Sequence, residues 1–156
     1  MIEIQIPGYQ GLAIENILLD FNGTLAIDGH LIEGVKEKIN QFADCLNFYV
    51  ITADTFGSVK KELETVRCSL QIIPEKNQAL SKLSYLQKLG PQKTIVAGNG
   101  SNDALMLEAA MLGVALVQQE GVSTKALRAS DLAVNNILDL FAYFENPGRL
   151  IACLRE

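Results

Sequence analysis

Tryptophan is absent from the 156 residues, and histidine occurs once, at position 30. Metal sites that need several histidines, such as a three-histidine zinc site, are therefore excluded. Cysteine is also scarce: Cys45, Cys68 and Cys153 are odd in number and widely spaced. We expect buried free thiols in a reducing, cytoplasmic compartment, and no disulfide framework.

Long hydrophobic runs and an excess of basic residues are missing too. No apolar stretch reaches the roughly 18 residues that a membrane-spanning helix needs, so we expect no membrane segment. Residues 1–6 carry neither a basic region nor a long apolar run, and no signal peptide is predicted. Thirteen Lys and Arg against eighteen Asp and Glu give a formal net charge of −5, which argues against nucleic acid as a partner.

What is present is an ordinary globular composition, with 49% hydrophobic and 20% charged residues. The length suits a single domain, residues 1–156.

Short apolar runs predict strands at 14–19, 48–51, 70–73, 94–97, 114–117 and 132–134. Apolar residues at helical spacing predict helices at 31–46, 59–66, 80–89 and 104–112, with two more after residue 134. This alternation predicts an α/β fold, a three-layer Rossmann-like parallel sheet with helices on both faces. Residues 1–13 are expected to add an edge hairpin that turns at 7–8.

Polar residues follow four of these strands at the point where each ends, and ligands bind at this edge of parallel sheets. After the first strand, Asp20 offers a carboxylate that suits a nucleophile or a metal ligand. Gly23 would let the backbone turn its N–H groups inward, as an anion site requires. The alternative is a capped loop. After the second strand, the Thr52 hydroxyl and the following helix N-terminus suit a phosphate oxygen, although Asp54 is better explained as a helix cap.

The third and fourth strand ends supply a cation and further oxygen ligands. Lys76 follows the third strand and would neutralise phosphate; Lys82 is the rival candidate, and a solvated surface lysine is the alternative. After the fourth strand, Asn99 and Asp103 offer the hard oxygen atoms that Mg²⁺ prefers. The alternative there is a glycine-rich turn with Asn102 or Asp103 as a helix cap.

Taken in order, the four segments resemble the motifs of the haloacid dehalogenase phosphohydrolase superfamily. Those motifs are Asp-x-Asp-Gly-Thr, a Ser or Thr that ends a strand, a Lys, and Gly-Asp-Gly-x-x-Asp. The resemblance runs over residues 14–134. Residues 52–54 and 100–104 are closer still to the phosphorylation domain of P-type ATPases, and small soluble P-type-ATPase-like proteins look most similar.

The intervals between the motifs are too short for a cap domain, so the resemblance implies a capless member. Residues 28–29 look like the turn of a small flap, with His30 as a turn residue.

The resemblance also implies roles for individual residues. Asp20 would be the nucleophile that forms an aspartyl-phosphate. Mg²⁺ would be held by Asp20, the backbone carbonyl of Asn22, and a side chain of the fourth motif, Asn99 or Asp103. The groups that would hold the phosphate are Gly23, Thr24, Thr52, Ala53, Lys76 and Asn102.

Two residues depart from the family pattern. Asn22 stands where the phosphatases carry an Asp as general acid and base, and an amide cannot shuttle protons at neutral pH. Asn99 stands where the family has an Asp, which removes one negative charge from the metal site. The sequence therefore predicts a magnesium-dependent phosphohydrolase, slowed by Asn22, acting on a phosphorylated small molecule or a nucleotide. The alternative is a catalytically degenerate module that binds phosphate or a protein partner.

The C-terminal segment 138–154 is rich in apolar residues. Two explanations fit this pattern. The segment either packs on the sheet or forms a homo-oligomer interface that also shields the uncapped site.

Overall fold

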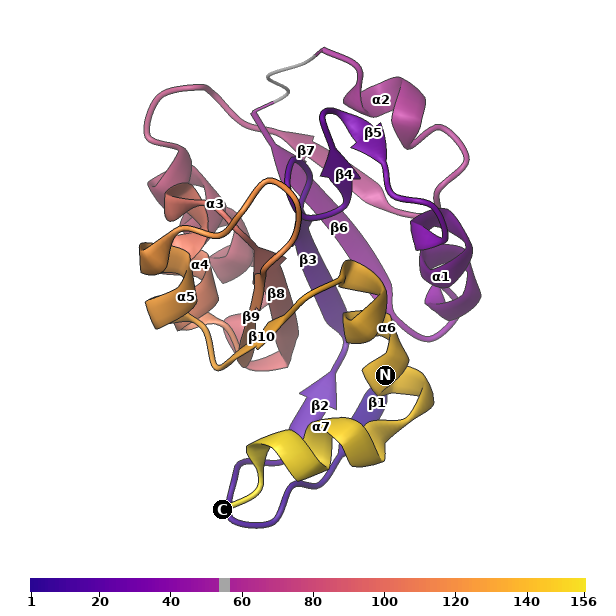
Figure 1. Ribbon diagram of the computed structural model, residues 1–156, viewed down its shortest axis with the longest axis vertical. Helices are drawn as coiled ribbons and strands as arrows, with labels where there is room; N and C mark the ends of the chain where they lie inside the picture. The colour runs from indigo at the N-terminus through magenta and orange to yellow at the C-terminus, as the bar shows by residue number, and fades with distance from the viewer. Residues whose placement is uncertain (54–56) are drawn as a thin grey trace.

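The computed structural model describes residues 1–53 and 57–156, and a six-stranded sheet forms its centre (Figure 1). The strand order is β10-β9-β8-β3-β6-β7, and every neighbouring pair in it is parallel. The strands are β3 (Asn16–Asp20), β6 (Asn47–Thr52), β7 (Ser69–Ile72), β8 (Thr94–Gly98), β9 (Leu112–Leu116) and β10 (Leu132–Val134). The predicted Rossmann-like α/β fold is confirmed.

Strand β3 occupies the middle of the sheet, and all five of its residues are buried. From β3 the chain adds β6 and β7 on one side, then returns to the other side of β3 and adds β8, β9 and β10. The direction of winding thus reverses between β3 and β8. A crevice forms at the carboxyl ends of strands where the order reverses, so the fold places Asp20 beside the loop that follows β8.

Helices cover both faces of the sheet (Figure 1). Leu18 joins the apolar cluster under α3, α4 and α5, whereas Ile17 and Leu19 join the cluster under α1, α2 and α6. The helices are α1 (Val35–Phe42), α2 (Val59–Glu62), α3 (Gln78–Leu89), α4 (Ala104–Ala109), α5 (Thr124–Ala129), α6 (Ile137–Glu145) and α7 (Pro147–Leu154), with 3₁₀ turns η1 (Pro91–Lys93) and η2 (Ser101–Asp103).

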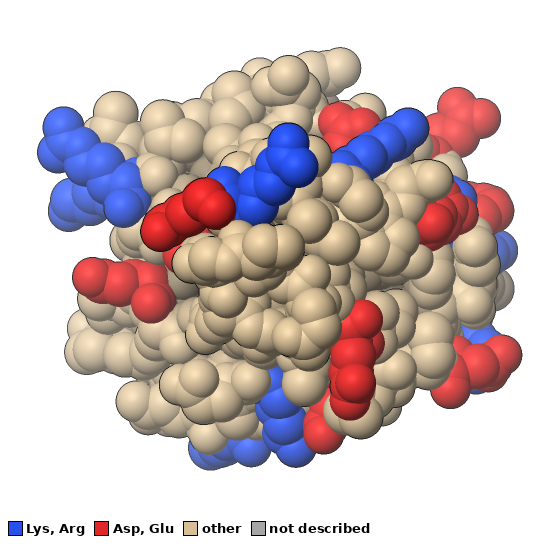
Figure 2. Space-filling view, turned by 90° about the horizontal axis from the view of Figure 1, so that it is seen from below, with Lys and Arg blue, Asp and Glu red and all other residues tan. Residues whose placement is uncertain are grey.

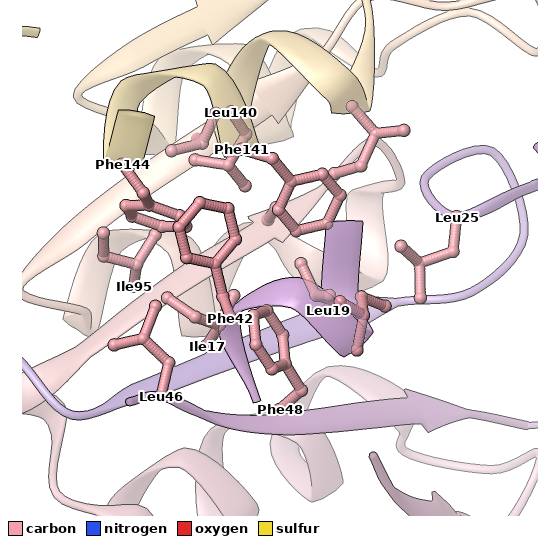
Figure 3. Close-up of a cluster of buried hydrophobic side chains, with 14 of the residues drawn as sticks. Ile17, Leu19, Leu25, Phe42, Leu46, Phe48, Ile95, Leu140, Phe141 and Phe144 are labelled. Atoms are coloured by element: carbon pink, nitrogen blue, oxygen red, sulfur yellow. The ribbon is translucent and has the colours of Figure 1, made fainter. Parts of the chain in front are cut away.

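Helix α6 supplies aromatic residues to the larger cluster (Figure 3). The Phe144 ring meets Phe42 edge-on at a centroid distance of 5.5 Å, and Phe141 lies 6.2 Å from Phe48. Side chains of α6 thus pack on the sheet of their own chain, which supports the first of the two explanations for the apolar C-terminal segment. Homo-oligomerisation stays a prediction.

The first residues form a hairpin, β1 (Ile2–Ile4) with β2 (Leu12–Ile14), as expected. It is a separate two-stranded sheet, however, and does not extend an edge of the central one. Because the sequence pattern shows only that the hairpin is half-buried, it could not indicate where it docks. Helix α7 lies alongside it, and both chain ends lie at this end of the molecule (Figure 1).

The predicted flap is the hairpin of β4 (Ala26–Ile27) and β5 (His30–Leu31). Its turn residues, Asp28 and Gly29, both have positive φ, at 51° and 80°, as two-residue hairpin turns require. His30 is exposed and lies 3.7 Å from Glu62, so it faces α2. Between β3 and β6 the chain has room only for this flap and α1.

Several expected boundaries differ from the structure. Helix α1 is shorter than 31–46 because β5 uses the first residues of that apolar pattern. No periodic pattern predicts helix α5, since Ala126 is its only buried residue.

The expectation of buried thiols is wrong for Cys45 and Cys153, which are exposed. Cys68 is half-buried, and burial raises the pKa of its thiol to about 11.

The surface carries charges of both signs. On the face seen in Figure 2, basic and acidic side chains are interspersed among larger uncharged areas. Within the described ranges, every helix is too short or too polar to cross a bilayer.

Candidate active site

A buried lysine joins two carboxylates at the carboxyl edge of the sheet. Asp20 ends β3, Asp103 ends the 3₁₀ turn after β8, and Lys82 lies on α3. The Lys82 ammonium donates to Asp20 Oδ1 and to Asp103 Oδ1, each at 2.6 Å. The side chains of Lys82 and Asp103 are 1% and 0% exposed, and that of Asp20 is 10% exposed. These three residues are called the Asp–Lys–Asp cluster below.

The Asp–Lys–Asp cluster holds one more negative than positive charge when both carboxyl groups are ionised. Burial and the neighbouring Asp103 raise the pKa of Asp20 to about 7, against the opposing effect of Lys82. Burial alone would lower the pKa of Lys82, but the two carboxylates outweigh it and raise that pKa. Lys82 therefore stays charged, and Asp20 is the group at which a further cation would be stabilised.

The Asp103 carboxylate accepts three hydrogen bonds from the chain. Its Oδ2 accepts the backbone N–H groups of Asn99 and Gly100, at 3.0 and 2.8 Å. Gly98 makes this possible, because a Cβ at that position would lie 2.5 Å from the carboxyl carbon of Asp103. With both oxygens engaged, Asp103 positions Lys82 and the loop after β8. Its role as a direct metal ligand stays a prediction.

The structure selects Lys82 over Lys76, the lysine favoured by its position just after the third strand. Lys76 is exposed in the segment between β7 and α3. Six residues later, Lys82 points from α3 across the end of β3. The preference for Lys76 is therefore corrected, because the course of α3 over the sheet determines which lysine reaches Asp20.

A cavity of about 180 Å³ opens above the Asp–Lys–Asp cluster. Asp20, Asn22, Thr52 and Ala53, all predicted site residues, lie in its wall. The other lining residues are Gln78, Lys82, Asn99, Gly100 and Asn102. The structure thus brings together residues from three of the four predicted strand ends, and helix α3 contributes Gln78 and Lys82 in place of the segment after the third strand. The neighbouring Asp54, expected to be a helix cap, lies outside the described residues.

The loop after β3 leaves two buried oxygen atoms unsatisfied. Asn22 Oδ1 and Thr24 Oγ1 are inaccessible to solvent and have no hydrogen-bond partner within residues 1–53 and 57–156. Thr24 is completely buried behind the loop, whereas Asn22 lies in the wall of the cavity. An unpaired buried oxygen is costly in a native fold and calls for an explanation.

Asn99 is fixed against the same loop. Its Nδ2 donates to the Gly121 carbonyl at 3.0 Å, which leaves its side-chain oxygen as the atom it can offer to a ligand. Gly23 permits this approach, because a Cβ there would lie 2.3 Å from Asn99 Nδ2. Gly23 also has a φ of +80°, which favours glycine. The Gly23 position is thus required by packing as well as by the turn.

Two glutamines at the site, Gln78 and Gln118, were not predicted from the sequence. Gln78 lies one helical turn before Lys82 on α3 and accepts the side-chain N–H of Asn102 at 2.6 Å. Gln118 follows β9, and its Nε2 donates to the carbonyls of Gly23 and Thr24, both at 3.0 Å. Its Oε1 accepts the Ile137 N–H at 2.8 Å. Neither glutamine belongs to one of the four motifs, so the sequence alone could not identify them as site residues.

We expect Gln118→Ala to lower the free energy of unfolding by about 1–3 kcal/mol, because three backbone groups lose a buried partner. We expect it also to lower the affinity for phosphate, since the loop after Asp20 loses its tether. Gln119→Ala is the matched control, since Gln119 is exposed and should change stability by less than about 0.5 kcal/mol. Urea unfolding measures the stability of both variants, and titration with inorganic phosphate measures their affinity. Equal midpoints for the two variants would show that the tether contributes nothing.

Comparison with known proteins identifies the fold family. Residues 31–127, more than half of the chain, match the family of haloacid dehalogenase-like hydrolases. The chain belongs to this family. The resemblance inferred from the four motifs is thereby confirmed.

Relatives of this haloacid dehalogenase-like hydrolase occur in Methanocaldococcus jannaschii. The chain is 40% identical to an uncharacterized protein over 83 residues, which cover 53% of this chain and 89% of the relative. It is 30% identical to a soluble P-type ATPase-like phosphatase over 142 residues, which cover 88% of this chain. That alignment spans only 52% of the phosphatase, about half of its length.

A solved structure shares the fold. The 3-deoxy-D-manno-octulosonate 8-phosphate phosphatase of Moraxella catarrhalis, crystallised with magnesium and phosphate ions and its sugar, superposes with a TM-score of 0.65. The match covers 90% of this chain and 92% of that one at 15% identity. At this identity the likeness concerns the fold alone.

The residues at the cavity fit a divalent cation bound mainly through oxygen. In the described part of the chain, no three His, Cys, Asp or Glu side chains gather into a metal site. Magnesium needs fewer, because one or two carboxylates together with water and phosphate oxygens suffice. Asp20 would supply the charge, and Asn22 Oδ1 is an oxygen with no partner among the described side chains and backbone. The donor set is therefore compatible with Mg²⁺ but carries little charge.

Proposed function

We propose that this haloacid dehalogenase-like hydrolase is a phosphohydrolase for phosphorylated small molecules or nucleotides, acting through Asp20 as the nucleophile. The observation that carries the proposal is the Asp–Lys–Asp cluster, where Asp20 faces a small polar cavity at the point where the strand order reverses. The soluble P-type ATPase-like phosphatase from Methanocaldococcus jannaschii supports the same activity.

The chain's own groups can bind and orient a phosphoryl group. Lys82 holds one oxygen of Asp20, and this bond keeps the carboxyl group turned toward the cavity. Thr52 and the side chain of Asn102 lie in the cavity wall, where they can meet phosphate oxygens. In-line attack by Asp20 then forms an aspartyl-phosphate, which water hydrolyses in a second step.

Mg²⁺ is the cofactor that we infer for this site, in keeping with the magnesium in the related phosphatase structure. Asp20, the backbone carbonyl of Asn22 and the side-chain oxygen of Asn99 would hold it. When bound, it would offset the repulsion between the Asp20 carboxylate and the phosphate. Asp103 would position Lys82 and the loop after β8, since each of its oxygens accepts hydrogen bonds from the chain.

A second function is favoured by one feature of the cavity. Amide side chains stand at Asn22 and Asn99, where the family pattern has carboxylates, so the cavity has lost charge. A module that binds phosphate or a phosphorylated protein without turnover would need only a polar cavity of this kind, with amides at these two positions. Isothermal titration with inorganic phosphate and Mg²⁺, run beside activity assays, separates the two functions. Binding without turnover supports the module.

The test of the proposed activity is a screen of phosphomonoesters and nucleotides with Mg²⁺, with Asp20→Asn as the control. We expect turnover by the native chain and loss of turnover in the variant. Since the variant removes the excess negative charge of the Asp–Lys–Asp cluster, its melting temperature should be equal or higher. Lost activity could not then be attributed to unfolding. Undiminished turnover in Asp20→Asn, or none in the native chain, would contradict the proposal.

A further inference from the structure

Gln78 connects two segments of the cavity wall through the two ends of its side-chain amide. It is the first residue of α3 and lines the cavity. Its Nε2 donates to the backbone carbonyl of Glu75 at 3.1 Å, and its Oε1 accepts an N–H from Asn102 Nδ2 at 2.6 Å. The segment between β7 and α3 is thereby tied to the 3₁₀ turn η2.

These two hydrogen bonds fix the orientation of both amides. A backbone carbonyl can only accept, so the end of the Gln78 amide that faces Glu75 has to be its NH₂ group. The Gln78 oxygen then faces Asn102, which has to meet it with its own NH₂ group. The Glu75 carbonyl thus determines the direction of the Asn102 amide through Gln78.

The oxygen of the Asn102 amide is held against the backbone of its own loop. A Cβ at Gly100 would lie 2.4 Å from Asn102 Oδ1, so a glycine at this position leaves room for the oxygen. The amide nitrogen carries two hydrogen atoms, and Gln78 accepts one of them. Because Asn102 lines the cavity, the second N–H is a donor that the side chain can offer to a ligand there.

A donor held in this orientation suits an anion. Lys82 lines the same cavity and lies one helical turn after Gln78 on α3. A hydrogen bond donated to a charged oxygen is stronger than one between neutral groups. An amide turned the other way would present its oxygen to the anion and repel it. Fixing the amide before the anion binds removes that arrangement and lowers the entropy cost of binding.

We propose that Gln78 is a positioning residue for the phosphoryl group: it orients the amide of Asn102 so that Asn102 donates an N–H to a phosphoryl oxygen. Gln78 acts through Asn102 and not on the phosphoryl group itself. This inference rests on the proposed function, in which a phosphoryl group occupies the cavity, and it adds a residue that lies outside the four motifs.

The experiment measures the affinity for inorganic phosphate by isothermal titration at saturating Mg²⁺, with a double-mutant cycle on Gln78 and Asn102. Asn102→Ala should weaken binding by about 10–100-fold, the contribution of a hydrogen bond to a charged group. Gln78→Met keeps the length of the side chain without its amide and should weaken binding by about 3–10-fold, because the Asn102 amide can then turn. Gln87→Met, an exposed position on the same helix, is the matched control and should bind phosphate like the native chain.

The double variant separates positioning from the other roles that Gln78 could have. In the Asn102→Ala background, Gln78→Met should change the affinity by less than about 2-fold, because the side chain that it orients is already gone. Loss of a direct contact with phosphate, or a general loosening of the fold, would lower the affinity by the same factor in both backgrounds and would overturn the inference. Gln78→Ala takes the place of Gln78→Met if the methionine variant does not fold.

The same titration distinguishes failure of this inference from failure of the proposed function. Native affinity in Gln78→Met would overturn the positioning role and leave the phosphate site in place. Absence of phosphate binding by the native chain would overturn the proposed function and this inference with it.

Discussion

Replacing Lys82 by methionine should destabilise the protein by about 3–5 kcal/mol at neutral pH, the usual cost of removing one partner from a buried ion pair. Methionine keeps the length and apolar stem of the side chain. It leaves Asp20 and Asp103 buried within reach of each other with no cation between them. Phosphate binding and any turnover should fall to background, because Asp20, the proposed nucleophile, loses the group that orients it.

Lys76→Met is the matched control for this change. Lys76 is exposed, and its replacement should shift stability by less than about 0.5 kcal/mol. Urea unfolding at neutral pH measures both variants. The double variant Lys82→Met, Asp20→Asn should recover part of the loss, because it removes one of the two uncompensated charges. A Lys82→Met protein as stable as the native one would show that the Asp–Lys–Asp cluster is not formed in solution.

Asn22→Asp should increase phosphatase activity toward alkyl phosphates by about 10²–10⁴-fold, the range contributed by a general acid or base. The new carboxyl group would occupy the place of an amide whose oxygen is buried and unpaired at the edge of the cavity. It can donate a proton to the leaving oxygen and later accept one from the attacking water. The amide can do neither.

The same substitution should lower the stability of the metal-free protein. The Asp–Lys–Asp cluster already has an excess negative charge, and a further buried carboxylate nearby adds to the repulsion. We therefore expect a larger rise in melting temperature on adding Mg²⁺ to Asn22→Asp than to the native chain. Thermal unfolding with and without Mg²⁺ measures this difference. A folded variant that binds Mg²⁺ and gains no activity would show that turnover is limited elsewhere.

The alternation of short apolar runs with helical patterns is sufficient to predict the order of strands along the chain and the class of fold. Strands in the middle of a parallel sheet are buried on both faces, so they are largely apolar and the first polar residue marks their end. For this reason the amino-acid sequence by itself places Asp20, Thr52 and Asn99 at strand ends. The parallel arrangement then brings those ends to a single edge of the sheet, where the cavity lies.

The tertiary structure alone decided which lysine serves the site and what Asp103 does. The pattern of residues put Lys76 at a strand end, but a lysine reaches a site by the direction of its side chain, and α3 carries Lys82 across the end of β3. The contact between Gln118 and Gly23 joins residues 95 positions apart and follows from the adjacency of distant loops. Local periodicity reports which face of an element is buried. Side-chain contacts between elements depend on how helices and loops lie over the sheet, which is determined by packing of the whole chain.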